Sequence, residues 1–212
     1  MSNDTEVNKG TNAQFDRALA LCRDIFVRKL KDYGPSWRLL RPQSVTDQLF
    51  IKAKRIRSLE TKGVTKVGEG ILPEFIAIVN YAIIGIIQLR LGYVDTKDFS
   101  VDEAVANYDK VAAEARTLML AKNHDYDEAW RGMRVPTYTD FILTKIERVK
   151  EIEDHDGRTQ VSEGIDSNYM DMMNYAVFGI IKLTEGDGQC ADTTGERVNS
   201  GAEKPGAEGT GA

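Results

Sequence analysis

The sequence predicts an all-α protein of six helices, built as two tandem three-helix repeats that pack with pseudo-twofold symmetry. A Lys-x-x-Asp-Tyr-x-x-x-Trp-Arg-x-x-Arg motif at residues 29–41 returns at residues 122–134, an offset of 93 residues. Apolar residues recur at helical spacing, and no segment alternates apolar and polar residues long enough to argue for a strand. Each repeat is small for a core of its own, so we expect the pair to form one domain.

The repeats occupy residues 13–92 and 93–184. Residues 1–12 are polar and unpatterned, and residues 185–212 are rich in Gly, Ala, Glu, Thr and Ser. Neither end carries enough apolar residues to bury, so we predict a disordered N-terminus and a disordered tail.

The first helix of repeat 1 is predicted over residues 13–32. Phe15, Leu19, Cys22 and Phe26 follow one helical face, and Gly34-Pro35 stops the helix. In repeat 2, Ser100-x-x-Glu103 is a capping-box pattern that opens the equivalent helix, which we expect to end near His124.

The second helices are predicted to open at two further capping patterns. Ser44-x-x-Asp47 precedes a helix that runs to about Lys62, and Thr137-x-x-Asp140 precedes its counterpart, which runs to about Asp154. We therefore interpret both aspartates mainly as capping residues.

The third helices are predicted over residues 72–91 and 166–184. Pro73 lies where a proline in the first turn of a helix is tolerated. The most apolar run, from Ile76 to Leu89, is too short for a membrane span and fits a buried core helix.

Charge separates the two repeats. The chain carries a formal charge of −5, but residues 13–92 hold 14 Lys/Arg against 7 Asp/Glu, whereas residues 93–184 hold 11 against 18. The overall balance gives no strong signal for nucleic acid. Two cysteines suggest neither a disulfide framework nor a zinc site. We expect a soluble, cytoplasmic, bacterial protein with no membrane partner, and a homodimer stays open.

A recurring set of basic and aromatic residues forms the candidate binding site. Arginines three residues apart beside a tryptophan suit phosphate contact and base stacking, which suggests a nucleotide ligand. The alternative is that the tryptophans fill the core and the aspartates pair with the arginines. The set is Lys29, Asp32, Trp37, Arg38, Arg41, Lys52 and Arg55, with Lys122, Asp125, Trp130, Arg131, Arg134, Lys145 and Arg148.

Asn80 and Asn174 recur inside nearly continuous apolar runs of the third helices. A buried amide without a hydrogen bond costs about 1–3 kcal/mol, so each must find a partner. A neighbouring helix would satisfy them structurally, and a bound ligand would satisfy them functionally. We include both residues in the candidate substrate site.

Four carboxylates of repeat 2 form the candidate metal site. If the third helix extends back to Glu163, then Glu163 and Asp171 share one face of it, and Glu147 and Glu151 lie four apart on the preceding helix. Oxygen ligands of this kind suit Mg²⁺. The alternative is a solvated acidic face. Basic and acidic repeats would also dock by charge complementarity alone.

The Lys-x-x-Asp-Tyr segment, Lys-x-x-Arg on the second helices and Asn-Tyr-Ala on the third resemble the nucleotide modification associated domain 1 family, a domain of unknown function. The resemblance covers nearly all of residues 15–184 and implies an all-helical domain that acts on free or modified nucleotides. The chain is also distantly similar to the all-α nucleoside triphosphate pyrophosphatases of the MazG type. Their Glu-x-x-Asp motif is split here into Glu74-x-x-Ala77 and Asn168-x-x-Asp171.

These observations lead to one expectation and one alternative. We expect a nucleotide-binding protein, with Mg²⁺-dependent pyrophosphohydrolase activity as its sharper form. Repeat 1 would supply the phosphate-binding cations, and repeat 2 would supply the carboxylates. The alternative is a non-catalytic helical binding or scaffold protein in which duplication replaced homodimerisation.

Overall fold

The computed structural model describes residues 3–63, 70–161 and 163–185, with side chains described from residue 10 onward. Within these ranges the chain is all-α and has no strand. The helices are α1 (Asn3–Tyr33), α2 (Pro42–Lys62), α3 (Leu72–Leu91), α4 (Val101–Tyr126), α5 (Val135–Asp154) and α6 (Ile165–Glu185). Two short 3-10 helices, η1 (Ser36–Leu39) and η2 (Ala129–Gly132), follow α1 and α4. The prediction of two three-helix units is therefore confirmed.

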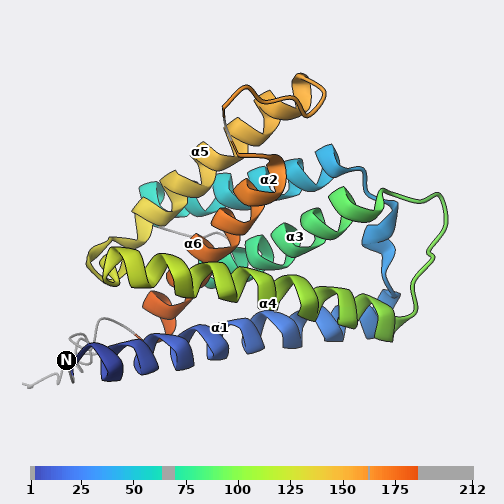
Figure 1. Ribbon diagram of the computed structural model, residues 1–212. Coiled ribbons are helices and arrows are strands. Elements are labelled where there is room, and N and C mark those ends of the chain that lie inside the picture. Colours follow the sequence, from blue (N-terminus) through green and yellow to red (C-terminus); the bar gives the residue numbers. More distant parts are fainter. Residues whose placement is uncertain (1–2, 64–69, 162, 186–212) are drawn as a thin grey trace, which may run out of the picture.

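The helices form three layers, and each layer takes one helix from each repeat (Figure 1). Helices α3 and α6 cross in the middle, with α2 and α5 on one side and α1 and α4 on the other. The central pair is the most apolar and supplies much of the core. Neither repeat has a core separate from the other, so the chain folds as one unit.

Reciprocal hydrogen bonds between α2 and α5 demonstrate the pseudo-twofold axis. The Thr46 hydroxyl donates to Glu153 at 2.7 Å, and the Thr139 hydroxyl donates to Glu60 at 2.9 Å. The two threonines occupy equivalent positions of the repeats, as do the two glutamates. Each contact is therefore the symmetry mate of the other.

The same symmetry relates α1 to α4. The Arg23 guanidinium donates to both oxygens of Asp109 at 2.7 and 2.9 Å, and Arg116 donates to both oxygens of Asp16 at 2.6 and 3.0 Å. The 93-residue offset relates these two pairs as well. The repeat thus extends back into α1, well before the motif at residue 29.

The crossing of α3 and α6 depends on two equivalent glycines. A Cβ atom at Gly85 would lie 2.7 Å from the Tyr169 ring, and one at Gly179 would lie 3.0 Å from the Phe75 ring. Each repeat presses an aromatic ring of its third helix against the glycine of the other. The glycines therefore permit a close helix crossing, as their position in the motif suggested.

Three predicted element starts are wrong. Helix α1 begins at Asn3, so residues 3–12 are helical; Thr11 is buried because Glu128 and Arg131 bond its hydroxyl. Helices α2 and α5 begin two residues before the predicted caps, because a proline lies in the first turn of each.

The capping box at Ser100 and Glu103 is confirmed. Apart from Glu185, the predicted tail lies outside the described residues.

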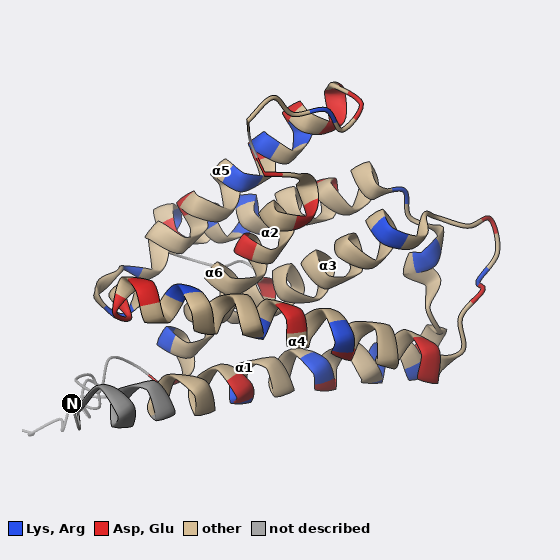
Figure 2. Ribbon diagram, viewed as in Figure 1, with Lys and Arg blue, Asp and Glu red and all other residues tan. Residues whose placement is uncertain are grey.

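Asp47 and Asp140 therefore do not cap these helices. Each instead pairs with a cation of the opposite repeat: Lys150 Nζ lies 3.7 Å from Asp47, and Arg57 pairs with Asp140. Arginines of repeat 1 meet acids of repeat 2 at three further places. Figure 2 shows basic and acidic residues on both of the facing helices α1 and α4. Ion pairs therefore join the two repeats around their shared apolar core.

By length and hydropathy, α3 could cross a membrane, but 72% of its most apolar window is buried inside the protein. Thirteen residues of α3 are buried, and α6, α2, α4 and α1 pack against this helix. Burial of this extent is typical of a core helix, which agrees with the sequence prediction.

Candidate functional site

Each repeat carries the same pocket between its first helix, its 3-10 helix and its third helix. The repeat 1 pocket has a volume of about 210 Å³, and the repeat 2 pocket has a volume of about 270 Å³. Equivalent lysines, tyrosines, tryptophans and asparagines line both. In repeat 1 these are Lys29, Tyr33, Trp37, Asn80 and Tyr81, and in repeat 2 they are Lys122, Tyr126, Trp130, Asn174 and Tyr175.

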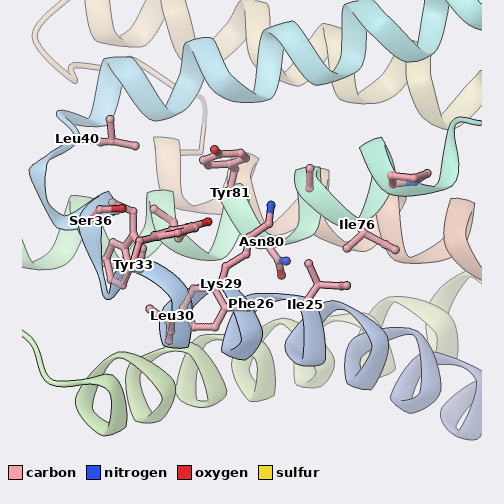
Figure 3. Close-up of a pocket in the computed structure, with 14 residues that line it drawn as sticks. Ile25, Phe26, Lys29, Leu30, Tyr33, Ser36, Leu40, Ile76, Asn80 and Tyr81 are labelled. Atoms are coloured by element: carbon pink, nitrogen blue, oxygen red, sulfur yellow. The ribbon is translucent and has the colours of Figure 1, made fainter. Parts of the chain in front are cut away.

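The repeat 1 pocket opens between α1 and α3, as Figure 3 shows. Its walls are mainly apolar, with Ile25, Ile76 and Leu40 among them. Lys29 is exposed at this pocket, and within the described part of the chain it makes no hydrogen bond or ion pair. A cation beside an apolar and aromatic cavity is a plausible phosphate ligand.

Trp37 closes the inner end of the repeat 1 pocket. It is 7% exposed and packs against Phe26 and Phe99, with ring centroids 6.4 and 6.0 Å away. Its indole Nε1 is buried and has no hydrogen-bond partner among the described residues. The ring is therefore part of the core, and its N–H group is a buried donor without a partner in the described residues.

Asn80 is satisfied within the fold. Its Nδ2 donates to the Cys22 carbonyl at 3.1 Å, and its Oδ1 accepts from the Tyr108 hydroxyl at 2.8 Å. These partners lie on α1 and α4. The structural alternative for this amide, a bond to neighbouring helices, is therefore correct.

Asn174 differs from its counterpart. It is 5% exposed, and neither its Oδ1 nor its Nδ2 has a hydrogen-bond partner in the described residues. The position equivalent to Tyr108 is Phe15, which has no hydroxyl to donate. Trp130 Nε1 in the same pocket is likewise buried and unpartnered.

Asp171 joins Lys122 and Lys145 at the edge of the repeat 2 pocket. Lys145 Nζ lies 2.6 Å from its Oδ2, and Lys122 bonds its Oδ1. Burial would raise the pKa of Asp171, but the hydrogen bonds from the two lysines outweigh it and leave the pKa below the ordinary value of 3.8. Burial lowers the pKa of Lys122, and the bond to Asp171 more than offsets this. Asp171 is therefore an ionised partner of two lysines.

Repeat 1 places its acid one turn earlier on the third helix. Glu74 is 3% exposed, pairs with Arg55, and lies 3.2 Å from Lys52 Nζ without the alignment of a hydrogen bond. Ala77 stands where repeat 2 has Asp171. Lys29 consequently has no acid opposite it, whereas Lys122 does.

Two of the predicted phosphate-binding arginines hold the fold together. Arg38 is 2% exposed; it donates to Asp98 at 2.8 and 3.0 Å and to the Gly92 carbonyl at 2.6 Å. Arg131 bonds Glu128 at 2.5 Å and lies 4.4 Å from the Trp130 ring. We correct the prediction for both: these guanidinium groups are already occupied.

The remaining predicted residues lie outside the two pockets. Arg41 and Arg134 are exposed N-cap residues of α2 and α5, and Arg41 lies 5.7 Å from the Tyr93 ring. Asp32 and Asp125 are also exposed, and Arg38 pairs with Asp98 where the sequence suggested Asp32. The loop contacts expected between aspartates and arginines are therefore not formed.

The four predicted metal ligands do not converge. Glu147, Glu151 and Glu163 line an open cavity of about 750 Å³ between α5 and the start of α6, together with Lys145 and Arg148, whereas Asp171 faces the repeat 2 pocket. Among the described residues, no three His, Cys, Asp or Glu side chains are placed to hold a metal ion. The arrangement does not fit a magnesium centre.

Sequence reasoning missed the tyrosines of both pockets. Tyr33 and Tyr126 are exposed, and Tyr81 and Tyr175 are half-buried. Burial raises the pKa of Tyr175, with Asp171 nearby. All four belong to the recurring motifs, and that recurrence was the signal that could have identified them.

Comparison with family models gives a match at each repeat. The model described as nucleotide modification associated domain 1 matches residues 29–89 and 122–183, which together are more than half of the chain. The comparison with curated proteins gave no match, and neither did the comparison with solved structures.

Proposed function

The chain belongs to the nucleotide modification associated domain 1 family, and from this premise we propose that it is a nucleotide-binding protein. In this proposal, the repeat 1 pocket takes the base, and Lys29 binds the phosphate. The family assignment supports a nucleotide ligand only through the family's description. The pocket supplies the chemical argument.

One observation carries the proposal: Lys29 is a cation without an ion pair in the described residues, and it borders an aromatic pocket that holds a free indole donor. In repeat 2, Asp171 pairs with Lys122, the equivalent of Lys29. In repeat 1, the position of Asp171 is taken by the uncharged Ala77, which lines the pocket beside Lys29. A phosphate would provide the missing counter-charge. The Trp37 N–H would donate to an acceptor atom of the base.

The size of the pocket limits what enters it. Sites for drug-sized ligands have volumes of about 300–1,000 Å³, and the repeat 1 pocket is smaller, at about 210 Å³. A nucleobase suits this volume, while the phosphates would stay at the mouth beside Lys29. The proposal therefore favours recognition of the base and the first phosphate over enclosure of a triphosphate.

Pyrophosphohydrolase activity of the MazG type is the finer form of the proposal, and it receives less support. Such chemistry requires carboxylates that hold Mg²⁺, and the described carboxylates do not converge. The carboxylate of Asp171 already accepts hydrogen bonds from Lys122 and Lys145. We derive no step through a metal, and a requirement for Mg²⁺ stays a prediction.

A non-catalytic scaffold is the second candidate function. The charged pairs and threonine–glutamate bonds between the repeats favour it, because they show that many recurring polar residues stabilise the fold. Under this function the pockets would bind no nucleotide.

A thermal-shift screen of the whole protein against nucleoside mono-, di- and triphosphates, with and without Mg²⁺, tests the proposal. A ligand at a hundredfold excess over Kd stabilises the native state by about 2.7 kcal/mol, which raises Tm by several degrees. We expect Lys29→Met to remove the shift. Lys110→Met is the matched control, since Lys110 is exposed on α4 and lines neither pocket.

A nucleotide shift that Lys29→Met removes and Lys110→Met retains would support the proposal. If no nucleotide shifts the wild-type Tm, the protein is not a nucleotide binder of this kind, and the scaffold function takes precedence. A shift that appears only with Mg²⁺ would revive the hydrolase form and justify an assay for pyrophosphate release.

A further inference from the structure

We propose that the repeat 2 pocket is a second binding site, which takes an uncharged nucleobase or nucleoside through the Asn174 amide. This proposal concerns a separate cavity from that of Lys29 and stands without nucleotide binding there. It rests on the hydrogen-bonding groups, the charge and the volume of the repeat 2 pocket.

Three hydrogen-bonding atoms of the residues that line this pocket have no hydrogen-bond partner in the described part of the chain. They are Oδ1 and Nδ2 of Asn174 and Nε1 of Trp130, on side chains that are 5% and 6% exposed. A buried polar group without a partner costs about 1–3 kcal/mol, so a fold seldom retains several at one place without a use for them. A ligand that pairs with all three would recover this cost.

Comparison with repeat 1 shows how this amide became free. Tyr108 donates its hydroxyl to Asn80 at 2.8 Å, whereas the equivalent position beside repeat 2 is Phe15. Phe15 is fully buried and packs against Phe178, with ring centroids 6.1 Å apart. The pseudo-symmetric hydroxyl is absent, and Asn174 lines the pocket that Phe178 also lines.

Charge favours a neutral ligand. Lys122, the equivalent of Lys29, is already bonded to Asp171, and both residues line the pocket. Among the residues that line the pocket, this ion pair adds no net charge, because Lys145, the second lysine bonded to Asp171, lines the neighbouring cavity between α5 and α6 instead. A phosphate that approached Lys122 would meet the Asp171 carboxylate. The repeat 2 pocket therefore discriminates against the anionic ligands that suit repeat 1.

The amide defines the chemical class of the ligand. An asparagine side chain presents a donor and an acceptor in one plane, which matches the adjacent acceptor and donor on the edge of a nucleobase. Phe178 stacks on one face of Trp130 at 4.6 Å, and Arg131 covers the ring at 4.4 Å. A base would therefore stack on Tyr126, Phe141 or Tyr175 at the mouth, and only the Trp130 edge would contact it.

Isothermal titration of the Lys29→Met protein with adenosine, guanosine, cytidine and uridine tests this site alone. We expect at least one nucleoside to bind, with the same affinity as in the wild type. Asn174→Leu removes the donor and acceptor, and we expect it to weaken binding at least tenfold. Circular dichroism on each variant verifies that it is folded.

Phe15→Tyr provides a second variant that leaves Asn174 in place. The new hydroxyl would donate to Asn174 Oδ1, as Tyr108 does to Asn80, and would compete with the ligand. We expect nucleoside affinity to fall at least tenfold and Tm to hold or rise. Lys110→Met is the control, because Lys110 is exposed on α4 and lines neither pocket, so this variant should leave nucleoside affinity unchanged.

Three results would overturn the proposal. One is the absence of binding by all four nucleosides to the wild type, which would mean that solvent satisfies Asn174. Another is equal affinity in the wild type, Asn174→Leu and Phe15→Tyr. The third is binding that Lys29→Met abolishes, which would place the nucleoside in the repeat 1 pocket and bear on the proposed function instead.

Discussion

The repeat 1 pocket and the repeat 2 pocket share a frame, and three differences between the repeats change the charges and hydrogen bonds at or beside them. Lysine, tyrosine and tryptophan recur in both, but Ala77 corresponds to Asp171, Glu74 to Asn168, and the Tyr108 partner of Asn80 to Phe15. The first two changes move one acid by a turn of helix. As a result, Lys29 is free in repeat 1, whereas Lys122 is paired in repeat 2.

The third change acts in the opposite direction. Among the residues that the structure describes, Asn80 of repeat 1 has hydrogen-bond partners and Lys29 has no ion pair, whereas Lys122 of repeat 2 is paired and the Asn174 amide has no partner. Under the two proposals above, the duplicated cavities therefore offer different groups to a ligand, Lys29 in repeat 1 and Asn174 in repeat 2.

The largest expected effect comes from breaking the lysine clamp of repeat 2. Asp171→Ala leaves Lys122 and Lys145 close together without a counter-charge, and we expect a loss of about 3 kcal/mol in the free energy of unfolding. Urea denaturation measures it. Ala77→Ser at the equivalent position of repeat 1 is the control, with little change expected. A loss below about 1 kcal/mol for Asp171→Ala would show that solvent already screens the clamp.

The glycines of the central crossing should respond unequally. Gly85→Ala brings a Cβ atom to 2.7 Å from the Tyr169 ring, and we expect a net loss of about 2 kcal/mol despite the better helix propensity of alanine. Gly179→Ala meets Phe75 at 3.0 Å and should cost less. Thermal unfolding of the two variants compares them, and the reverse order would contradict the packing described for α3 and α6.

The two asparagines provide a direct test of the difference in hydrogen bonding. Asn80→Leu removes the hydrogen bonds to the Tyr108 hydroxyl and the Cys22 carbonyl, so we expect the free energy of unfolding to fall by about 1.5 kcal/mol. Asn174→Leu removes an amide that has no partner and should leave stability unchanged or increase it. Chemical denaturation of both variants decides the matter; equal losses would mean that the two amides are equally satisfied.

Moving the acid would convert one pocket toward the other. Ala77→Asp places a carboxylate opposite Lys29, in the position that Asp171 takes opposite Lys122. We expect nucleotide affinity at the repeat 1 pocket to fall about tenfold, which is about 1.4 kcal/mol. Titration calorimetry with the nucleotide that gives the largest thermal shift measures this. Ala77→Asn is the uncharged control, and an equal loss in both would indicate a steric cause.

The smallest expected effect concerns the symmetric hydrogen bonds between α2 and α5, Thr46 with Glu153 and Thr139 with Glu60. Burial raises the pKa of Glu60 and Glu153, and the threonine hydroxyls oppose it. A carboxyl with a raised folded-state pKa contributes stability below its unfolded pKa of about 4.5, and this is lost as pH rises through the folded value. Glu60→Gln and Glu153→Gln should therefore each stabilise by under about 1 kcal/mol at pH 7, and less at pH 4. Urea titrations at both pH values test it, and unequal effects would count against the symmetry.

The sequence predicted the fold better than the helix starts. Six helices and the duplication follow from apolar spacing and from a motif that recurs in register. The predicted starts of α2 and α5 were wrong because Ser44 and Thr137 resemble N-cap residues. In the structure, Pro42 and Pro136 already lie in the first turns of these helices. A local capping pattern cannot decide between two neighbouring helix starts, because its side chains can also form tertiary contacts. Asp47, which was predicted to cap α2, pairs with Lys150 of α5 instead.

The site was predicted only in part, for a similar reason. Recurrence selected Lys29, Trp37 and Asn80 as binding residues, and the structure places all three around one pocket. It could not separate them from Arg38, which recurs equally but is bonded to Asp98. Carboxylate spacing on α5 and α6 also suggested a cluster, yet the direction in which each side chain projects depends on packing between helices. Recurrence reports common descent, and only contacts distinguish a binding group from a structural one.

The most direct test of the difference between the pockets is a single set of titrations with two ligands and two variants. A nucleoside 5′-monophosphate and its nucleoside are titrated into the wild type, Lys29→Met and Asn174→Leu. We predict that Lys29→Met weakens the monophosphate at least tenfold and spares the nucleoside, and that Asn174→Leu does the reverse. If both variants weaken both ligands equally, or neither variant weakens either ligand, the two pockets do not have the separate preferences described above.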